Sequence, residues 1–241
     1  MLRLTCVAIV SLSACARSTP APTPPLAPAE VVIPALVEAT RGPGLVPYVD
    51  ELYALGWSAD GRRFAYAIER ADEACGCLTV DLHIASSTGE PLWWSDHYRS
   101  DELGSLDALN FPELWARRGA EWTAALRARG ITQAPTSPLT PLPIGGAAVP
   151  RFEIATTAVG DDAAVGFAHL TSYEVGIVRG DVPESVARFD AGDGLGPLAV
   201  TVAGYIEAPD QDHAVAIIVE TWRGWEGQQQ VETVRVAPAS R

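Results

Sequence analysis

The chain has 241 residues, and its 17 basic side chains, all of them Arg, stand against 30 acidic ones for a formal net charge of −13. This acidic balance argues against a nucleic-acid partner, because phosphate contacts need a basic surface, and the absence of Lys excludes Schiff-base chemistry and a P-loop lysine. The length suits one domain or two small ones, and the hydrophobic fraction of 48% predicts a globular body.

Residues 1–14 have the pattern of a secretory signal peptide. Arg3 precedes an apolar run that is too short to cross a membrane as a permanent helix, which takes about 20 apolar residues. The next boundary, Leu12-Ser13-Ala14-Cys15, resembles the lipobox of bacterial lipoproteins. The resemblance implies cleavage before Cys15 and acylation of Cys15, so we expect the membrane to be a partner through a lipid anchor. An ordinary secretory signal that happens to precede a Cys is the alternative.

A Pro-rich segment follows the predicted anchor. Eight Pro lie between Ala16 and Pro47, and this composition is typical of a semi-rigid polyproline spacer that buries too little apolar surface to fold. We therefore interpret residues 15–47 as lipid anchor and tether. In the lipoprotein family an Asp after the acylated Cys retains the protein at the inner membrane, and this chain has Ala16 there. The resemblance thus implies a lipid-anchored protein of the cell envelope, and the outer membrane is its expected destination.

Residues 48–241 are expected to form a β-rich globular domain, with halves at about 48–130 and 147–241. Apolar residues alternate with polar ones in most segments, which is typical of half-buried strands, and Asp60-Gly61 is a hairpin-turn signal. The segment Leu78–Ser86 is the clearest example. Its inward face is expected to consist of Leu78, Val80, Leu82 and Ile84, and its solvent face of Thr79, Asp81 and His83. The predicted fold class is mainly β (α+β), built from antiparallel meanders with one amphipathic helix.

That helix is expected to begin after Asn110. Asn110 can cap it, Pro112 lies in its first turn, and Glu113 completes a capping-box pattern. An apolar stripe at helical spacing follows, and Gly130 is placed where a left-handed residue often ends a helix. The stripe consists of Phe111, Leu114, Trp115, Trp122 and Leu126.

The segment Gly56–Tyr66 resembles the strand–turn–strand motif of WD40-like propeller repeats. A diverged second copy is suggested over Ala203–Glu220, so the domain is expected to contain two diverged propeller-like units; a chance match between hairpins is the alternative. The order of parts, which includes the late segment Arg223–Gly227, is similar to a family of predicted secreted bacterial proteins of unknown function. That resemblance implies secretion and a β-rich fold, and it implies no activity.

Cys75 and Cys77 are the two thiols expected in the mature body besides Cys15. In an oxidising compartment a local disulfide is the favoured interpretation, with free or redox-active thiols and a soft-metal site as the alternatives. No HExxH pattern and no Gly-x-Ser-x-Gly elbow occurs in the sequence. We therefore predict no catalytic residue, no metal site and no cofactor.

Aromatic residues with charged neighbours mark a candidate binding edge late in the chain. It consists of Trp222, Arg223, Trp225 and Glu226, a combination typical of surfaces that hold a sugar or a peptide, although Trp side chains that merely cover the core are the alternative. The sequence thus favours an envelope lipoprotein that acts as a non-catalytic binding or structural module, with a protein or glycan of the envelope as partner. The second hypothesis is a secreted hydrolase whose catalytic residues are dispersed along the chain.

Overall fold

The computed structural model describes residues 34, 36–37, 48–72, 77–86, 96–99, 110–134, 139–141, 151–162, 167–179, 182–192, 194–210, 212–224 and 230–239. The chain divides into two units, Met1–Glu30 and Val31–Arg241, and every described residue belongs to the second. The predicted signal peptide and Cys15 therefore lie outside the described residues. Leu36–Val37, within the segment interpreted as a tether, pairs with a strand of the body.

The second unit is mainly β, with antiparallel sheets and a single helix among its described residues, which confirms the predicted fold class. The elements are β1 (Leu36–Val37), β2 (Tyr48–Val49), β3 (Glu51–Ser58), β4 (Arg63–Asp72), β5 (Cys77–Ser86), β6 (Asp96–Arg99), α1 (Phe111–Ala128), β7 (Ile131–Gln133), β8 (Thr140–Pro141), β9 (Arg151–Asp162), β10 (Phe167–Arg179), β11 (Val182–Asp190), β12 (Ala199–Glu207), β13 (Ala214–Arg223) and β14 (Gln230–Pro238).

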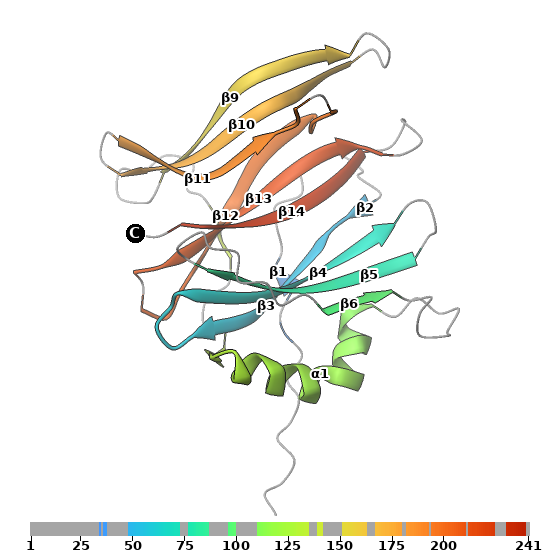
Figure 1. Ribbon diagram of the computed structural model, residues 1–241, viewed down its shortest axis with the longest axis vertical. Coiled ribbons are helices and arrows are strands. Elements are labelled where there is room, and N and C mark those ends of the chain that lie inside the picture. The colour runs from blue at the N-terminus through green and yellow to red at the C-terminus, as the bar shows by residue number, and fades with distance from the viewer. Residues whose placement is uncertain are drawn as a thin grey trace, which may run out of the picture. The chain divides into compact units, whose positions relative to one another are not determined.

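The strands form three sheets (Figure 1). The first sheet has the order β1-β3-β4-β5-β6, with β7 also paired to β3. The second sheet has the order β2-β14-β13-β12-β8, and the third has the order β11-β10-β9. All pairs are antiparallel except that of β14 with β2, which is parallel.

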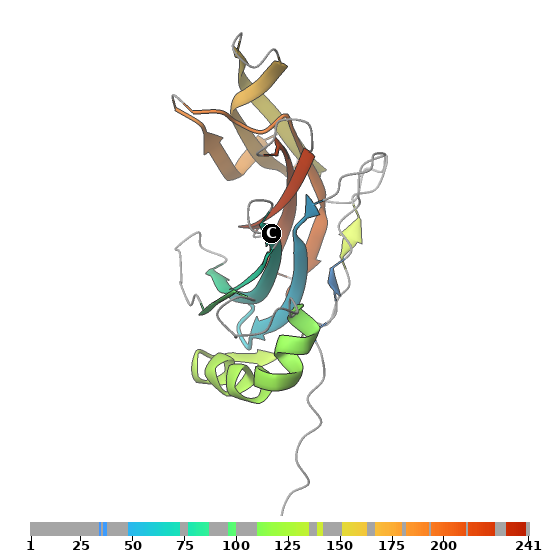
Figure 2. The ribbon, with the colours of Figure 1, turned by 90° about the vertical axis from the view of Figure 1, so that its right-hand side faces the viewer.

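Within this unit the helix and the sheets are stacked as layers, and Figure 2 shows the same order from the side. Helix α1 packs on one face of the first sheet, and the second sheet packs on the other. The third sheet covers the far face of the second. The alternation along β4 explains the first two contacts, because Phe64 and Ile68 point to the second sheet while Ala65 and Ala67 point to the helix.

One expectation about β5 is wrong. The helix does pack against Val80, Leu82 and Ile84, but Thr79, Asp81 and His83 do not face open solvent. They are half-buried, because the second sheet covers this face of the first sheet and β14 contacts β5. When both faces of a sheet are covered, a polar side chain on either face is costly to bury unless it has a hydrogen-bond or ion-pair partner or lines a pocket.

Helix α1 begins and ends as its sequence predicts. The Glu113 amide donates to Asn110 Oδ1 at 3.0 Å, and the Asn110 amide donates to Glu113 Oε2 at 3.2 Å, so the capping box is confirmed. The buried carboxylate of Glu69 on β4 accepts a further helix-terminal amide, that of Phe111. The predicted apolar stripe is buried, and Gly130 follows the helix with a φ of +82°.

The two hairpins that carry the proposed repeat have related irregularities. Leu55 is the extra residue of a bulge in β3 beside Gly56, and Ala203 is the extra residue of a bulge in β12 beside Gly204. The hairpins belong to different sheets, which face each other across a shared core. Propeller blades are separate four-stranded sheets around a central channel, so the structure does not confirm the propeller-like units.

The bulge at Gly56 predicts a specific sensitivity. Gly56 has a φ of +147°, and a Cβ added there would lie 2.4 Å from the Gln133 carbonyl oxygen on β7. We expect Gly56→Ala to lower the free energy of unfolding by about 2–3 kcal/mol or more, since backbone strain and a backbone clash act together. Urea denaturation measures this loss.

Gly192→Ala is the matched control. Its φ of +58° also disfavours a side chain, but nothing lies within 4 Å of the added Cβ. We expect it to cost only about 1 kcal/mol. Equal losses in the two variants would mean that a small shift of β7 relieves the contact at Gly56.

Candidate functional site

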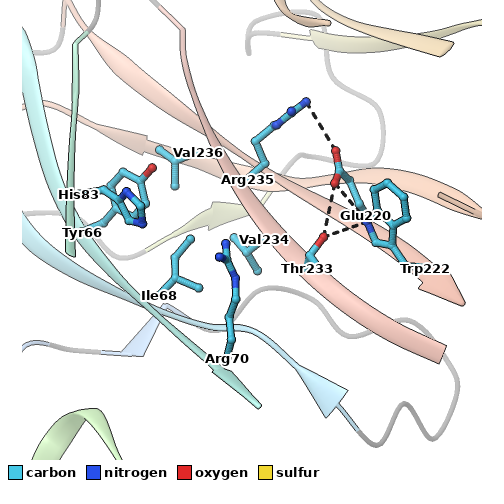
Figure 3. A pocket seen from close by; sticks show the side chains of 10 residues that line it. All are labelled: Tyr66, Ile68, Arg70, His83, Glu220, Trp222, Thr233, Val234, Arg235 and Val236. Atoms are coloured by element: carbon cyan, nitrogen blue, oxygen red, sulfur yellow. Dashed lines mark hydrogen bonds and ion pairs between the residues drawn. The ribbon is translucent and has the colours of Figure 1, made fainter. Parts of the chain in front are cut away.

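A pocket of about 450 Å³ lies along the edge of β14, where the first and second sheets meet (Figure 3). The first sheet contributes residues from β4 and β5, and the second contributes residues from β13 and β14. The lining residues are Tyr66, Ile68, Arg70, His83, Glu220, Trp222, Thr233, Val234, Arg235 and Val236.

Strand alternation explains how the pocket reaches both faces of β14. Val234 and Val236 pack with the core between the first two sheets, so Thr233 and Arg235 lie on the opposite face. Glu220 interacts with both of those residues and therefore belongs to that opposite face as well. The pocket thus follows the strand edge, with a mainly apolar inner side and a polar outer side.

Asp50 anchors the inner side of the pocket. At this residue the chain passes from β2 in the second sheet to β3 in the first. Its amide donates to the Glu232 carbonyl at 2.9 Å, and its Oδ2 accepts from the Val234 amide at 3.1 Å and from Arg70 Nε at 3.1 Å. Arg70 Nη1 also lies 3.4 Å from Asp81 Oδ2.

The burial of this ion pair is uneven. The side chain of Asp50 is 5% exposed, whereas that of Arg70 is 43% exposed. Burial raises the pKa of Asp50, although Arg70 and the Val234 amide both act to lower it. A guanidinium carries five N–H donors, and only two nitrogens of Arg70 face the acids, so the group retains donors for a ligand in the pocket.

Glu220 organises the outer side of the pocket. Its carboxylate accepts hydrogen bonds from the buried Tyr173 hydroxyl, from Trp222 Nε1 at 3.2 Å and from Thr233 Oγ1 at 3.4 Å. Arg235 Nη1 lies 3.6 Å from Glu220 Oε1. Again the acid is buried, with 9% of its side chain exposed, while the Arg is 41% exposed. Burial, together with the bond to Glu220, raises the pKa of Tyr173.

Tyr66 and His83 form an aromatic wall on the first sheet. Their ring centroids are 5.1 Å apart and the rings are nearly parallel, at 21°. Burial raises the pKa of Tyr66 to about 12 and lowers the pKa of His83, so both rings are neutral at pH 7. Neutral stacked rings offer a contact surface to an apolar or planar group.

The candidate binding edge from the sequence is only partly described. Trp222 lines the pocket, and its indole nitrogen donates to Thr233 Oγ1 at 3.0 Å as well as to Glu220. Arg223 is exposed and, as the next residue of β13, points to the opposite face of the sheet. Trp225 and Glu226 lie outside the described residues. The structure therefore places only Trp222 of this set in the pocket.

The predicted cysteine pair also falls outside what the structure describes. Cys75 is not described, and Cys77 is described only as the first residue of β5, without its side chain. Among the described residues, no three His, Cys, Asp or Glu side chains converge as a metal site would require. The same part of the chain holds no helix with the length and apolar character needed to cross a membrane.

Several pocket residues escaped the sequence analysis. Arg70 offered a usable signal, because it continues a row of β4 that is otherwise made of Phe64, Tyr66 and Ile68. A charged residue at the end of an apolar row indicates a buried partner or a site. Asp50 and Arg235 gave no such signal, because their partners Arg70 and Glu220 lie on other strands.

No protein-family model, curated protein or solved structure matches the chain significantly.

Proposed function

We propose that this chain is a lipid-anchored binding module of the bacterial cell envelope, and that the pocket along β14 is its binding site. One observation carries the proposal. Two half-exposed guanidinium groups, of Arg70 and Arg235, lie at this pocket with their buried carboxylate partners Asp50 and Glu220 beneath them. Buried partners fix the position of each cation before a ligand arrives, which reduces the entropy lost on binding.

The remaining lining also supports binding. The neutral rings of Tyr66 and His83 offer apolar contact, and the Trp222 indole and the Thr233 hydroxyl are bonded to the Glu220 carboxylate. No specific observation among the described residues favours the hydrolase hypothesis.

The anchor is tested by Cys15→Ser. If acylation of Cys15 holds the protein, the variant should move from the membrane fraction to the soluble periplasmic fraction, because loss of the acyl chains removes about 0.8 kcal/mol for each buried CH₂. Immunoblotting of fractionated cells measures the change. Cys6→Ser is the matched control, since Cys6 lies in the predicted signal peptide, and it should remain with the membrane. A Cys15→Ser protein that stays membrane-bound would contradict the lipid anchor.

The site is tested by photo-crosslinking in living cells. A benzophenone amino acid placed at Trp222, which lines the pocket, should give discrete adducts with an envelope component. The same amino acid at Glu121, an exposed residue of α1, should not. Mass spectrometry then identifies the adduct as protein or glycan. Equal crosslinking at both positions, or none at Trp222, would contradict a binding site on β14.

A further inference from the structure

One side of β14 is paired along only a small part of its length. On this side β2 pairs with Val231 and Glu232, and no other described strand pairs with β14 there. The opposite side of β14 is paired with β13 along the whole strand, from Gln230 to Pro238 and without a bulge. Among the described strands, the second sheet therefore has an open edge from residue 233 onward.

Three backbone hydrogen bonds establish which groups of β14 face this edge. The Glu232 carbonyl accepts from Asp50, and the Val234 amide donates to Asp50, so these two residues face away from β13. The Ala239 amide donates to the Ala214 carbonyl at the start of β13. The backbone groups of odd-numbered residues of β14 therefore face β13, and those of even-numbered residues face the other side. The amide and carbonyl of Val236 therefore point outward, as does the carbonyl of Pro238.

Asp50 marks where the open part of the edge begins. Its carboxylate accepts a hydrogen bond from the Val234 amide, at the place where β2 leaves the sheet. Beyond it the edge presents, in order, the Val234 carbonyl, the Val236 amide and carbonyl, and the Pro238 carbonyl. No hydrogen bond to these four groups from another described residue is found. Pro238 has no amide to leave unpaired, and such a residue is tolerated on an edge strand.

The pocket lies along this same edge, so the side chains around it define what could be added there. Val236 projects toward the first sheet, where Tyr66 and Ile68 form an apolar wall. On the other face Arg235 presents a half-exposed guanidinium. An added strand would direct alternate side chains to these two environments.

We propose that the pocket binds an extended peptide, which adds as a strand to β14 along Val234–Pro238. This inference rests on the proposed function and names the ligand class. A row of carbonyl, amide and carbonyl groups at strand spacing is matched by another extended backbone, which offers amide donors and carbonyl acceptors at the same spacing. The peptide carries apolar side chains toward Tyr66 and Ile68, and a carboxylate in the alternate row toward Arg235.

Phage-displayed random decapeptides, selected on the detergent-solubilised full-length protein, supply the probe. Peptides with alternating apolar and acidic residues should be enriched, and a synthetic copy of one allows its affinity to be measured by fluorescence anisotropy. N-methylation of single peptide amides should weaken binding at every second position, by about tenfold for each lost hydrogen bond. Val236→Pro, which removes the outward amide and keeps the pairing with β13, should have a similar effect.

Val236→Thr is the matched control, because it retains the amide and the branched side chain. It should bind within about threefold of the native protein, and thermal unfolding of both variants verifies that they fold. Hydrogen exchange should show the Val236 amide slowed by the peptide. A Val236 amide that is already protected in the free protein would overturn the proposal, since the edge would then be covered by the chain itself.

The remaining outcomes separate this inference from the proposed function. No peptide enrichment, an N-methyl scan without a two-residue period, or unchanged binding by Val236→Pro would overturn strand addition. If Trp222 still gives crosslinks, and above all crosslinks to a glycan, the binding module stands without the peptide. If Trp222 gives none, both proposals fail.

Discussion

Asp50→Ala is expected to lower the free energy of unfolding by about 2–3 kcal/mol at pH 7. The substitution leaves the Val234 amide without an acceptor in a nearly dry place, and it removes the charge-assisted bond from Arg70. The first loss is the larger one, because Arg70 is 43% exposed and water can replace its lost partner. Urea denaturation followed by circular dichroism measures the change.

Asp50→Asn is the matched control, because a single amide oxygen can accept from both Val234 and Arg70, as Asp50 Oδ2 does. Burial raises the pKa of Asp50 above its ordinary value of 3.8, so the net environment penalises the ionised carboxylate. The Asn variant should therefore be at least as stable as the native protein at pH 7. A large loss in the Asn variant would contradict this account and would show that the charge itself is required.

The two proteins should also differ in their pH dependence. The folded native chain holds the Asp50 proton more tightly than the unfolded chain does, because its folded pKa is raised. Its stability contribution is thus complete below about pH 3.8 and falls as the pH rises through the window between the ordinary and the raised pKa. The Asp50→Asn variant has no ionisable group at this position, so it does not lose this stability as the pH rises. Its advantage over the native protein should therefore grow with pH through that window, and a constant difference would contradict the raised pKa.

Local sequence signals were sufficient for the ends of α1 and for the row of β5 that packs against it. Asn110, Glu113 and Gly130 act through hydrogen bonds within a few residues of themselves, so their pattern carries the start and the end of α1. The alternation in β5 likewise identified the row that packs against the helix. The residues that make such interactions lie close together in the sequence, so a local pattern is enough to predict them.

The covering of the other row of β5 was not predictable in this way. Alternation distinguishes an apolar face from a polar one, but it does not say which sheet packs on the polar face. His83 belongs to a polar row and nevertheless lines a half-buried pocket, because β14, from the far end of the chain, packs over it. The sequence alone offered solvent as the simplest surrounding for that row.

The candidate site depends on contacts of still longer range. Asp50 and Val234 are 184 positions apart, and their bond forms only because β2 leaves the second sheet at that point. Trp222 drew attention as an aromatic residue beside charges, but its bonds to Glu220 and Thr233 require the pairing of β13 with β14. Pairing between strands is therefore the information that a single sequence lacked here.

Trp122→Ala is expected to produce the largest loss of stability, about 3–5 kcal/mol. Trp122 is fully buried between α1 and the first sheet, with its ring 5.7 Å from that of Trp115 and 6.2 Å from that of Phe111. Alanine there removes the apolar contact and leaves a cavity, since the neighbouring rings are held by the sheet and by their own helix backbone. Thermal and urea unfolding measure the loss.

Two controls separate the packing of Trp122 from other effects of the substitution. Trp122→Phe retains most of the ring contact and should cost less than half as much, whereas Glu121→Ala, at an exposed position on the same helix, should change the free energy of unfolding by no more than about 0.5 kcal/mol. Losses of equal size for Trp122→Ala and Trp122→Phe would contradict a cavity as the cause.

The same variant also distinguishes stability from binding. Most of the stability of a helix in a protein comes from packing of its apolar face, so α1 depends on this contact for its structure. The pocket lies on the opposite face of the first sheet from α1. At a temperature where Trp122→Ala remains folded, crosslinking from Trp222 should therefore persist. Loss of crosslinking in a folded Trp122→Ala protein would mean that α1 supports the pocket through the first sheet, which would make the two faces of that sheet a single cooperative unit.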